Sequence, residues 1–276
     1  MALTGAQPLA VSAARLAVAA AVLGAIALVA RPRTRPAGTA QEALLAVAGV
    51  ALAVHFAGWI WSLQYTSVAV STLLVATTPI WTALYDALVR RRPLSRLAVV
   101  AFLAGGAGLW LVVGWSKPSP PVPGHQLLGA ALALTGSLAI AVYFILIREV
   151  RARLETRAIV TRTYAWAALA LIAAAAIARQ PPPPWHDAAA WSGILAMPLI
   201  SQLLGHTALN ASLRWFTPSA VSFSTLVEPI VAALLALAIF RERLTPAAIA
   251  GGFVVLASIG IVLREEPVAE VVEEIL

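Results

Sequence analysis

Apolar residues in this 276-residue chain occur in long runs that are separated by short polar segments. Each run is about 20 residues long, the length of helix that crosses the hydrocarbon core of a membrane. The pattern therefore predicts an all-α polytopic membrane protein with about nine transmembrane helices. The predicted spans are residues 8–30, 42–63, 68–89, 97–115, 126–147, 158–178, 190–213, 219–240 and 246–263.

The polar segments contain the residues that stop helices and orient membrane proteins. Prolines occur in the segments 31–36, 90–93, 117–123 and 181–184, where they end helices. Thirteen Lys and Arg residues lie in one set of alternate loops together with the C-terminal end, and four lie in the opposite set. Because basic loops stay in the cytoplasm, this asymmetry predicts a cytoplasmic C-terminus and an external N-terminus.

Composition agrees with lipid as the surrounding solvent, because 61% of the residues are hydrophobic and only 11% are charged. The net charge of +7 comes from loop cations that the membrane orientation explains, so no nucleic-acid partner is expected. The chain has no cysteine, and it lacks phosphate-binding loops and the common hydrolase motifs. We therefore expect no enzyme activity, no cofactor and no metal site.

Two segments of the sequence resemble each other at an offset of 150 residues. Pro-Ile-Trp-Thr-Ala-Leu at 79–84 matches Pro-Ile-Val-Ala-Ala-Leu at 229–234, and His55 pairs with His206 after a one-residue slip. Because the offset crosses an odd number of spans, the copies face opposite ways. Many transporters build alternating access from such inverted repeats. The alternative is chance similarity between Ala/Leu/Val-rich helices.

The chain resembles the EamA-type transporters of the drug/metabolite transporter superfamily over nearly all of its length. The features that carry the resemblance are Pro8 with Arg15, Tyr65-Thr66 before a span with Pro79, Thr217-Pro218 before Leu226-Val-Glu-Pro229, and the turn at 241–244. The resemblance implies ten helices in two inverted five-helix repeats. It also implies transport of metabolites, often as export from the cell.

The first repeat is one helix short of that pattern. The predicted domains are residues 1–117 for the first repeat with four spans, 118–125 for a Pro-rich linker, 126–264 for the second repeat with five spans, and 265–276 for an acidic cytoplasmic tail. The first helix is the missing one, since residues 8–30 look like the second helix of such proteins. A start site assigned too far downstream or a truncation is one explanation, and a true nine-helix form is the other.

Polar and aromatic side chains inside the spans are the candidate substrate-binding groups, because polar groups are costly in lipid and usually face a cavity or a partner. Several pairs lie four or three residues apart and so share a helical face. The alternative for each is an interhelical hydrogen bond. The predicted substrate-binding residues are His55, Trp59, Thr78, Trp81, Tyr143, His206, Asn210, Ser224 and Glu228.

Two charged residues within the spans have more than one interpretation. Glu228 directly precedes Pro229, which interrupts regular helix. Its carboxylate either binds a proton or a cationic substrate group, or bonds a neighbouring helix and locks the structure. Arg15, about two turns into the first span, either snorkels, pairs with an acidic partner, or holds an anionic substrate.

These observations predict a secondary transporter in a cell inner membrane that moves a small metabolite or drug-like solute. Export by alternating access is the expected mode, with proton coupling through Glu228. A truncated non-catalytic membrane subunit or a channel-like helper is the alternative. The expected partners are the solute and the lipid bilayer, and a homodimer is left open.

Overall fold

Helices form all of the regular structure in the part of the chain that the computed structural model describes, namely residues 7–29, 38–113, 125–151, 153–182, 188–240 and 245–265. Helices satisfy their own backbone hydrogen bonds, as a lipid environment requires. The chain divides into two compact units, and each combines an early with a late segment. Unit 1 is Met1–Trp61 with Val142–Arg214, and unit 2 is Ser62–Ala141 with Trp215–Leu276.

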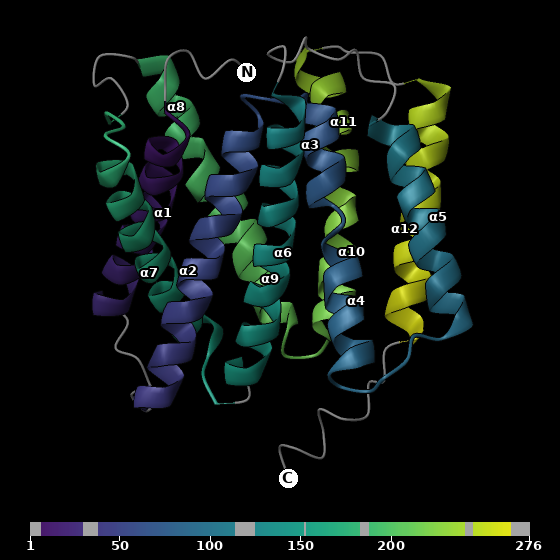
Figure 1. Cartoon of the computed structure of the whole chain (residues 1–276), viewed down its shortest axis with the longest axis horizontal. Coiled ribbons are helices and arrows are strands. Elements are labelled where there is room, and N and C mark those ends of the chain that lie inside the picture. Colours follow the sequence, from purple (N-terminus) through teal and green to yellow (C-terminus); the bar gives the residue numbers. More distant parts are fainter. Residues whose placement is uncertain are drawn as a thin grey trace. The chain divides into compact units, whose positions relative to one another are not determined.

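Unit 1 is built around two long helices that lie side by side, α1 and α7 (Figure 1). Its helices are α1 (Pro8–Val29), α2 (Thr39–Ser62) except for its last residue, the end of α6 (Gln126–Arg151), α7 (Thr156–Ile177), α8 (Ala188–Ala196), η1 (Met197–His206) and α9 (Thr207–Ser212). The last three follow one another without a gap, and the central one, η1, is a π-helix with Pro198 in its first turn. π-Helical segments are rare and frequently occur at functional sites.

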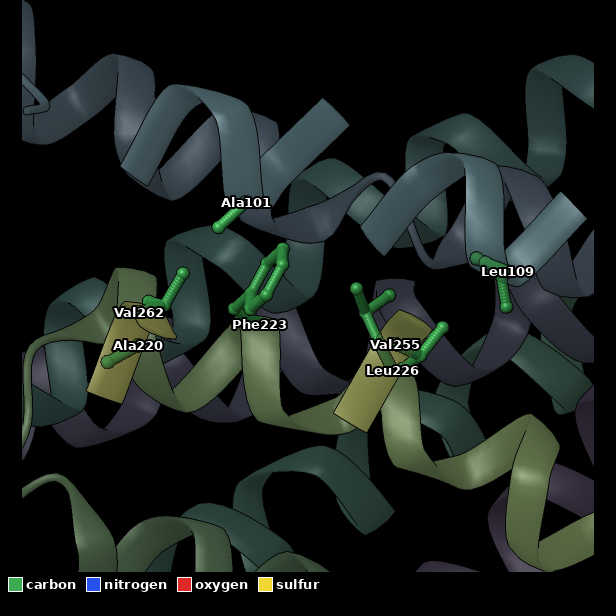
Figure 2. Packing of buried hydrophobic residues seen from close by; sticks show 7 residues of the cluster. All are labelled: Ala101, Leu109, Ala220, Phe223, Leu226, Val255 and Val262. Carbon is green, nitrogen blue, oxygen red and sulfur yellow. The ribbon is translucent and has the colours of Figure 1, made fainter. Parts of the chain in front are cut away.

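Unit 2 contains the remaining helices. They are α3 (Val68–Val75), α4 (Thr78–Leu88), α5 (Arg96–Val113), the first part of α6, α10 (Pro218–Ser224), η2 (Thr225–Val227), α11 (Glu228–Phe240) and α12 (Pro246–Glu265). Helices α5 and α12 run side by side (Figure 1). Figure 2 shows the buried cluster that joins this pair to α10 and η2, which contains Ala101 and Leu109 of α5, Phe223 of α10, Leu226 of η2 and Val255 of α12.

Close backbone contact holds α5 and α12 together. A methyl group built on Gly108 would lie 2.8 Å from the carbonyl oxygen of Gly251, and one built on Gly251 would lie 2.5 Å from the carbonyl oxygen of Gly108. No residue with a Cβ atom fits at such distances, so glycine at both positions permits the contact.

Within the described residues, six helices are long and apolar enough to cross a membrane, and they match six of the predicted spans. They are Pro8–Val29, Thr39–Ser62, Gln126–Arg151, Thr156–Ile177, Trp191–Ser212 and Pro246–Glu265. The apolar stretch of α5, Arg96–Val112, is shorter. The other two predicted spans, 68–89 and 219–240, are each interrupted. The total of nine spans therefore stays a prediction.

The two interruptions occur at corresponding places. Helix α4 begins at Thr78 and helix α11 begins at Glu228, positions that differ by the same 150 residues as the sequence repeat. Each is followed by a proline, which has no N–H to continue the preceding helix but fits the first turn of a new one. The helices before the breaks begin alike, with the hydroxyls of Ser67 and Thr217 accepting from backbone N–H groups three residues on, each at 3.2 Å.

Several predictions fall outside the described residues. These are the arginine-rich segment 31–36, the Pro-rich linker except for its last residue, the turn at 241–244 and the acidic tail after Glu265. The division into domains 1–117 and 126–264 stays a prediction.

Candidate functional site

A buried arginine in unit 1 hydrogen-bonds two polar side chains of another helix. Arg15 on α1 is 2% exposed. Its Nε and Nη2 donate to Oε1 of Gln202 at 3.2 and 3.0 Å, and Nη2 also donates to Oγ of Ser201 at 2.9 Å. The guanidinium carbon lies 4.1 Å from the ring centroid of Phe56, a cation–π distance. Helix η1 thus provides the polar partners, and α2 provides the aromatic one.

Four aromatic rings of α2 and η1 lie together next to this arginine. The ring of His206 at the end of η1 lies 5.3 Å from that of Phe56 and 6.3 Å from that of His55, centroid to centroid. His55 in turn stacks on Trp59 at 6.0 Å. The structure therefore brings together three of the predicted site residues, His55, Trp59 and His206. We call Arg15, Phe56, Ser201, Gln202 and His206 the Arg15 cluster.

A hydrogen-bonded chain leads from His206 to α6. The phenol of Tyr143 donates to Oδ1 of Asn210 at 2.8 Å, and Nδ2 of Asn210 donates to the carbonyl oxygen of His206 at 2.7 Å. Tyr143 and Asn210 are completely buried. Two further predicted residues are thus placed beside His206, and both use their polar atoms to hold α6 and α9 together.

In unit 2 the predicted residues Thr78 and Trp81 meet at one hydroxyl of α6. The indole N–H of Trp81 donates to Oγ of Ser137 at 3.1 Å. The hydroxyls of Thr77 and Thr78 lie 3.0 and 3.2 Å from the same oxygen. Ser137 is completely buried and therefore anchors the first turn of α4, directly after the helix break.

Replacing Ser137 with alanine is expected to lower the free energy of unfolding by about 1 kcal/mol, because it leaves the partly buried indole N–H of Trp81 without this acceptor. Thr135→Ala is the matched control, since the Thr135 hydroxyl is exposed and bonds only within α6, to Ala131. Unfolding in mixed micelles with increasing SDS measures both. Equal losses in the two variants would contradict the anchoring role.

Helices α4 and α10 are joined by two further polar contacts. The hydroxyls of Thr82 and Ser222 lie 2.8 Å apart, and Ser219 donates to the carboxylate of Asp86. All four side chains are buried. This hydroxyl-rich contact continues along α4 from the Ser137 anchor.

The remaining two predicted residues, Ser224 and Glu228, lie on either side of the second break. Because η2 interrupts the α-helix between them, the regular spacing on which the shared face was predicted does not apply. Ser224 donates to the carbonyl oxygen of Val221 in its own helix at 2.7 Å. Glu228 is exposed and is the first residue of α11.

Sequence reasoning omitted Gln202, Ser201 and Ser137 from the predicted site and left the role of Arg15 open. A signal was present for Gln202, which precedes His206 by four residues within a mostly apolar span. Ser137 had no comparable signal. In the described part of the chain, no group of three or more His, Cys, Asp or Glu residues could hold a metal ion.

Comparison with known proteins identifies the family. The chain matches the EamA-like transporter family over residues 1–114 and 127–264. No curated protein matches it. The chain is similar to a solved crystal structure that is described only as that of a protein, with 18% sequence identity. The superposition covers 95% of this chain and 90% of the other, and its TM-score of 0.75 shows that the two share a fold. The chain therefore belongs to the EamA-like transporter family, as the sequence predicted, and is a multi-pass membrane protein.

Proposed function

We propose that this protein is a secondary transporter that exports a small metabolite or drug-like solute across a cell inner membrane by alternating access. The observation that carries the proposal is the pair of helix breaks at Thr78 and Glu228, in a chain that belongs to a transporter family. Interrupted helices at membrane depth are tolerated where they are buried in protein or line a cavity, and transporters use them at substrate sites.

The correspondence of the two breaks supports an inverted repeat. Both follow a capped helix of similar length and precede a proline, with an offset of 150 residues. Two copies of one broken element, inserted in opposite directions, supply two equivalent gates for alternating access. The proposal keeps the nine predicted residues, from His55 in α2 to Glu228 in α11, as the candidate substrate-binding groups of their own units, and it keeps a cytoplasmic C-terminus.

Each unit, taken by itself, has side chains that suit a solute with aromatic and hydrogen-bonding parts. Unit 1 offers His55, Trp59 and His206 as neighbouring rings. Unit 2 offers the hydroxyls beside Trp81. Rings with a few oriented polar groups are typical of small-molecule sites.

Glu228→Gln is expected to abolish solute-driven proton movement, because glutamine has the shape of glutamate but cannot take up and release a proton at neutral pH. Vesicles containing the purified protein and a trapped pH dye would be exposed in turn to tryptophan, uridine and ethidium. Glu149→Gln is the control, since Glu149 is also exposed and lies near the end of α6. We expect Glu149→Gln to behave as the unmodified protein does.

Two results would reject parts of the proposal. Unchanged proton movement in a folded Glu228→Gln variant rejects the coupling role of this carboxylate. If the unmodified protein moves none of the three probes, the alternative of a non-catalytic membrane subunit or channel-like helper gains support.

A further inference from the structure

We propose that the Arg15 cluster binds a carboxylate group of the transported solute. This inference rests on the proposed transport function and adds the chemical class of the substrate. It is carried by two buried polar atoms on η1 that have no hydrogen-bond partner among the described residues, Nε2 of Gln202 and Nδ1 of His206. Both belong to side chains that are more than nine-tenths buried.

The orientation of the Gln202 amide follows from the chemistry of its neighbour. A guanidinium group only donates hydrogen bonds, so the amide atom that faces Nε and Nη2 of Arg15 must be the oxygen. The amide nitrogen then faces the other way, and it is also only a donor. Its missing partner must therefore be a hydrogen-bond acceptor.

The surroundings of this donor favour a negatively charged acceptor. Arg15 supplies a fixed positive charge next to Gln202, and such a charge repels cationic groups. The imidazole of His206 provides a second polar atom, Nδ1, that can donate when it carries the proton. A carboxylate has two oxygens that each accept hydrogen bonds, so it offers the acceptor that the amide nitrogen of Gln202 lacks.

The backbone of η1 is held in place around these side chains. The carbonyl oxygen of Gln202 accepts from the phenol of Tyr164 on α7 and from the hydroxyl of Thr207, each at 3.3 Å. The wide turns of a π-helix place side chains in positions that an α-helix does not provide. The unpartnered donor is thus part of a fixed arrangement, and leaving it unpartnered costs about 1–3 kcal/mol, which a bound carboxylate offsets.

The alternative explanation is structural, in which Gln202 only fixes Arg15 between α1 and η1. The two explanations differ in the effect of Gln202→Glu. Glutamate keeps an oxygen for Arg15 and adds an attractive charge, so the contact between α1 and η1 is retained. It also replaces the donor nitrogen by a carboxylate oxygen, which repels a second carboxylate.

The test uses the full chain in nanodiscs of phosphatidylcholine, which offer no anionic lipid headgroup. The probes are 3-phenylpropionate and its uncharged amide, two ligands of nearly the same shape. We expect the unmodified protein to bind the carboxylate at least about tenfold more tightly than the amide, and Gln202→Glu to weaken carboxylate binding roughly 10- to 100-fold while amide binding stays the same. Ligand-dependent shifts of the unfolding temperature give both affinities.

Gln180→Glu is the matched control for the added charge. Oε1 of Gln180 accepts from the backbone N–H of Leu9 at 2.9 Å, at the start of α1, and a glutamate keeps this contact and suits a helix N-terminus. This variant is expected to bind both probes as the unmodified protein does.

Equal affinities of the unmodified protein for the two probes, absence of carboxylate binding, or full carboxylate binding by Gln202→Glu would each overturn the assignment. Such a result leaves the proposed transport function open to its own test. If uridine or ethidium still crosses the vesicle membrane, the protein is a transporter whose substrate is not bound through a carboxylate.

Discussion

Gly251→Ala is expected to lower the free energy of unfolding by about 3 kcal/mol, the upper end of the usual cost of overpacking. The new Cβ atom would lie 2.5 Å from the carbonyl oxygen of Gly108 and 2.7 Å from Cβ of Leu111. Neither atom can rotate away, so α5 and α12 must separate along their contact. The buried cluster around Phe223 (Figure 2) loses packing as a consequence.

Gly106→Ala is the matched control on α5. A methyl group at Gly106 meets no atom within 4 Å, so this variant should be as stable as the unmodified protein or slightly more stable, since alanine favours helix over glycine. Unfolding by SDS in mixed micelles measures both. Similar stability losses in the two variants would show that the contact between α5 and α12 is not close.

The double variant Arg15→Met with Gln202→Leu is expected to fold normally but to transport carboxylate solutes at least about 100-fold more slowly. Replacing a buried charge together with its partner by apolar residues of similar size is often neutral or stabilising, so stability should be retained. The double change removes both the positive charge beside the bound carboxylate and the amide donor of Gln202, and truncating a buried charged contact of this kind costs several kcal/mol. Uptake of labelled 3-phenylpropionate into vesicles measures the rate.

Arg15→Lys separates the charge from the geometry of this site. Lysine keeps the positive charge but lacks the planar fork with which Arg15 reaches Gln202 and Ser201. We expect an intermediate transport rate for this variant. A double variant that is stable and still transports 3-phenylpropionate at the original rate would exclude Arg15 from substrate binding.

The helices were largely predictable because lipid demands long apolar runs. The first predicted span, residues 8–30, is helix Pro8–Val29, and the last, 246–263, lies within Pro246–Glu265. The sequence also predicted an interruption of regular helix next to Glu228, since Pro229 has no N–H to continue the preceding helix. The π-helix η1 was not predicted, because one proline in an apolar span does not specify how the following turns widen.

The site was predictable in part. The side chains of His55 and Trp59, four residues apart, stack on a common face, because such spacing depends only on local helix geometry. The hydrogen-bond partners of Trp81 and Arg15 were not predictable. Ser137 lies 56 residues from Trp81, and Gln202 lies 187 residues from Arg15, so only packing between helices brings these atoms together.

The sequence by itself determined the all-helical membrane class and the positions of most helices, since composition, run length and proline placement act within about 20 residues of chain. Tertiary structure alone decided which polar atoms are satisfied. The burial of Arg15, the orientation of the Gln202 amide and the unpartnered nitrogen of His206 depend on contacts between α1, α2 and η1. Such contacts join residues far apart in the chain, and no local pattern specifies them.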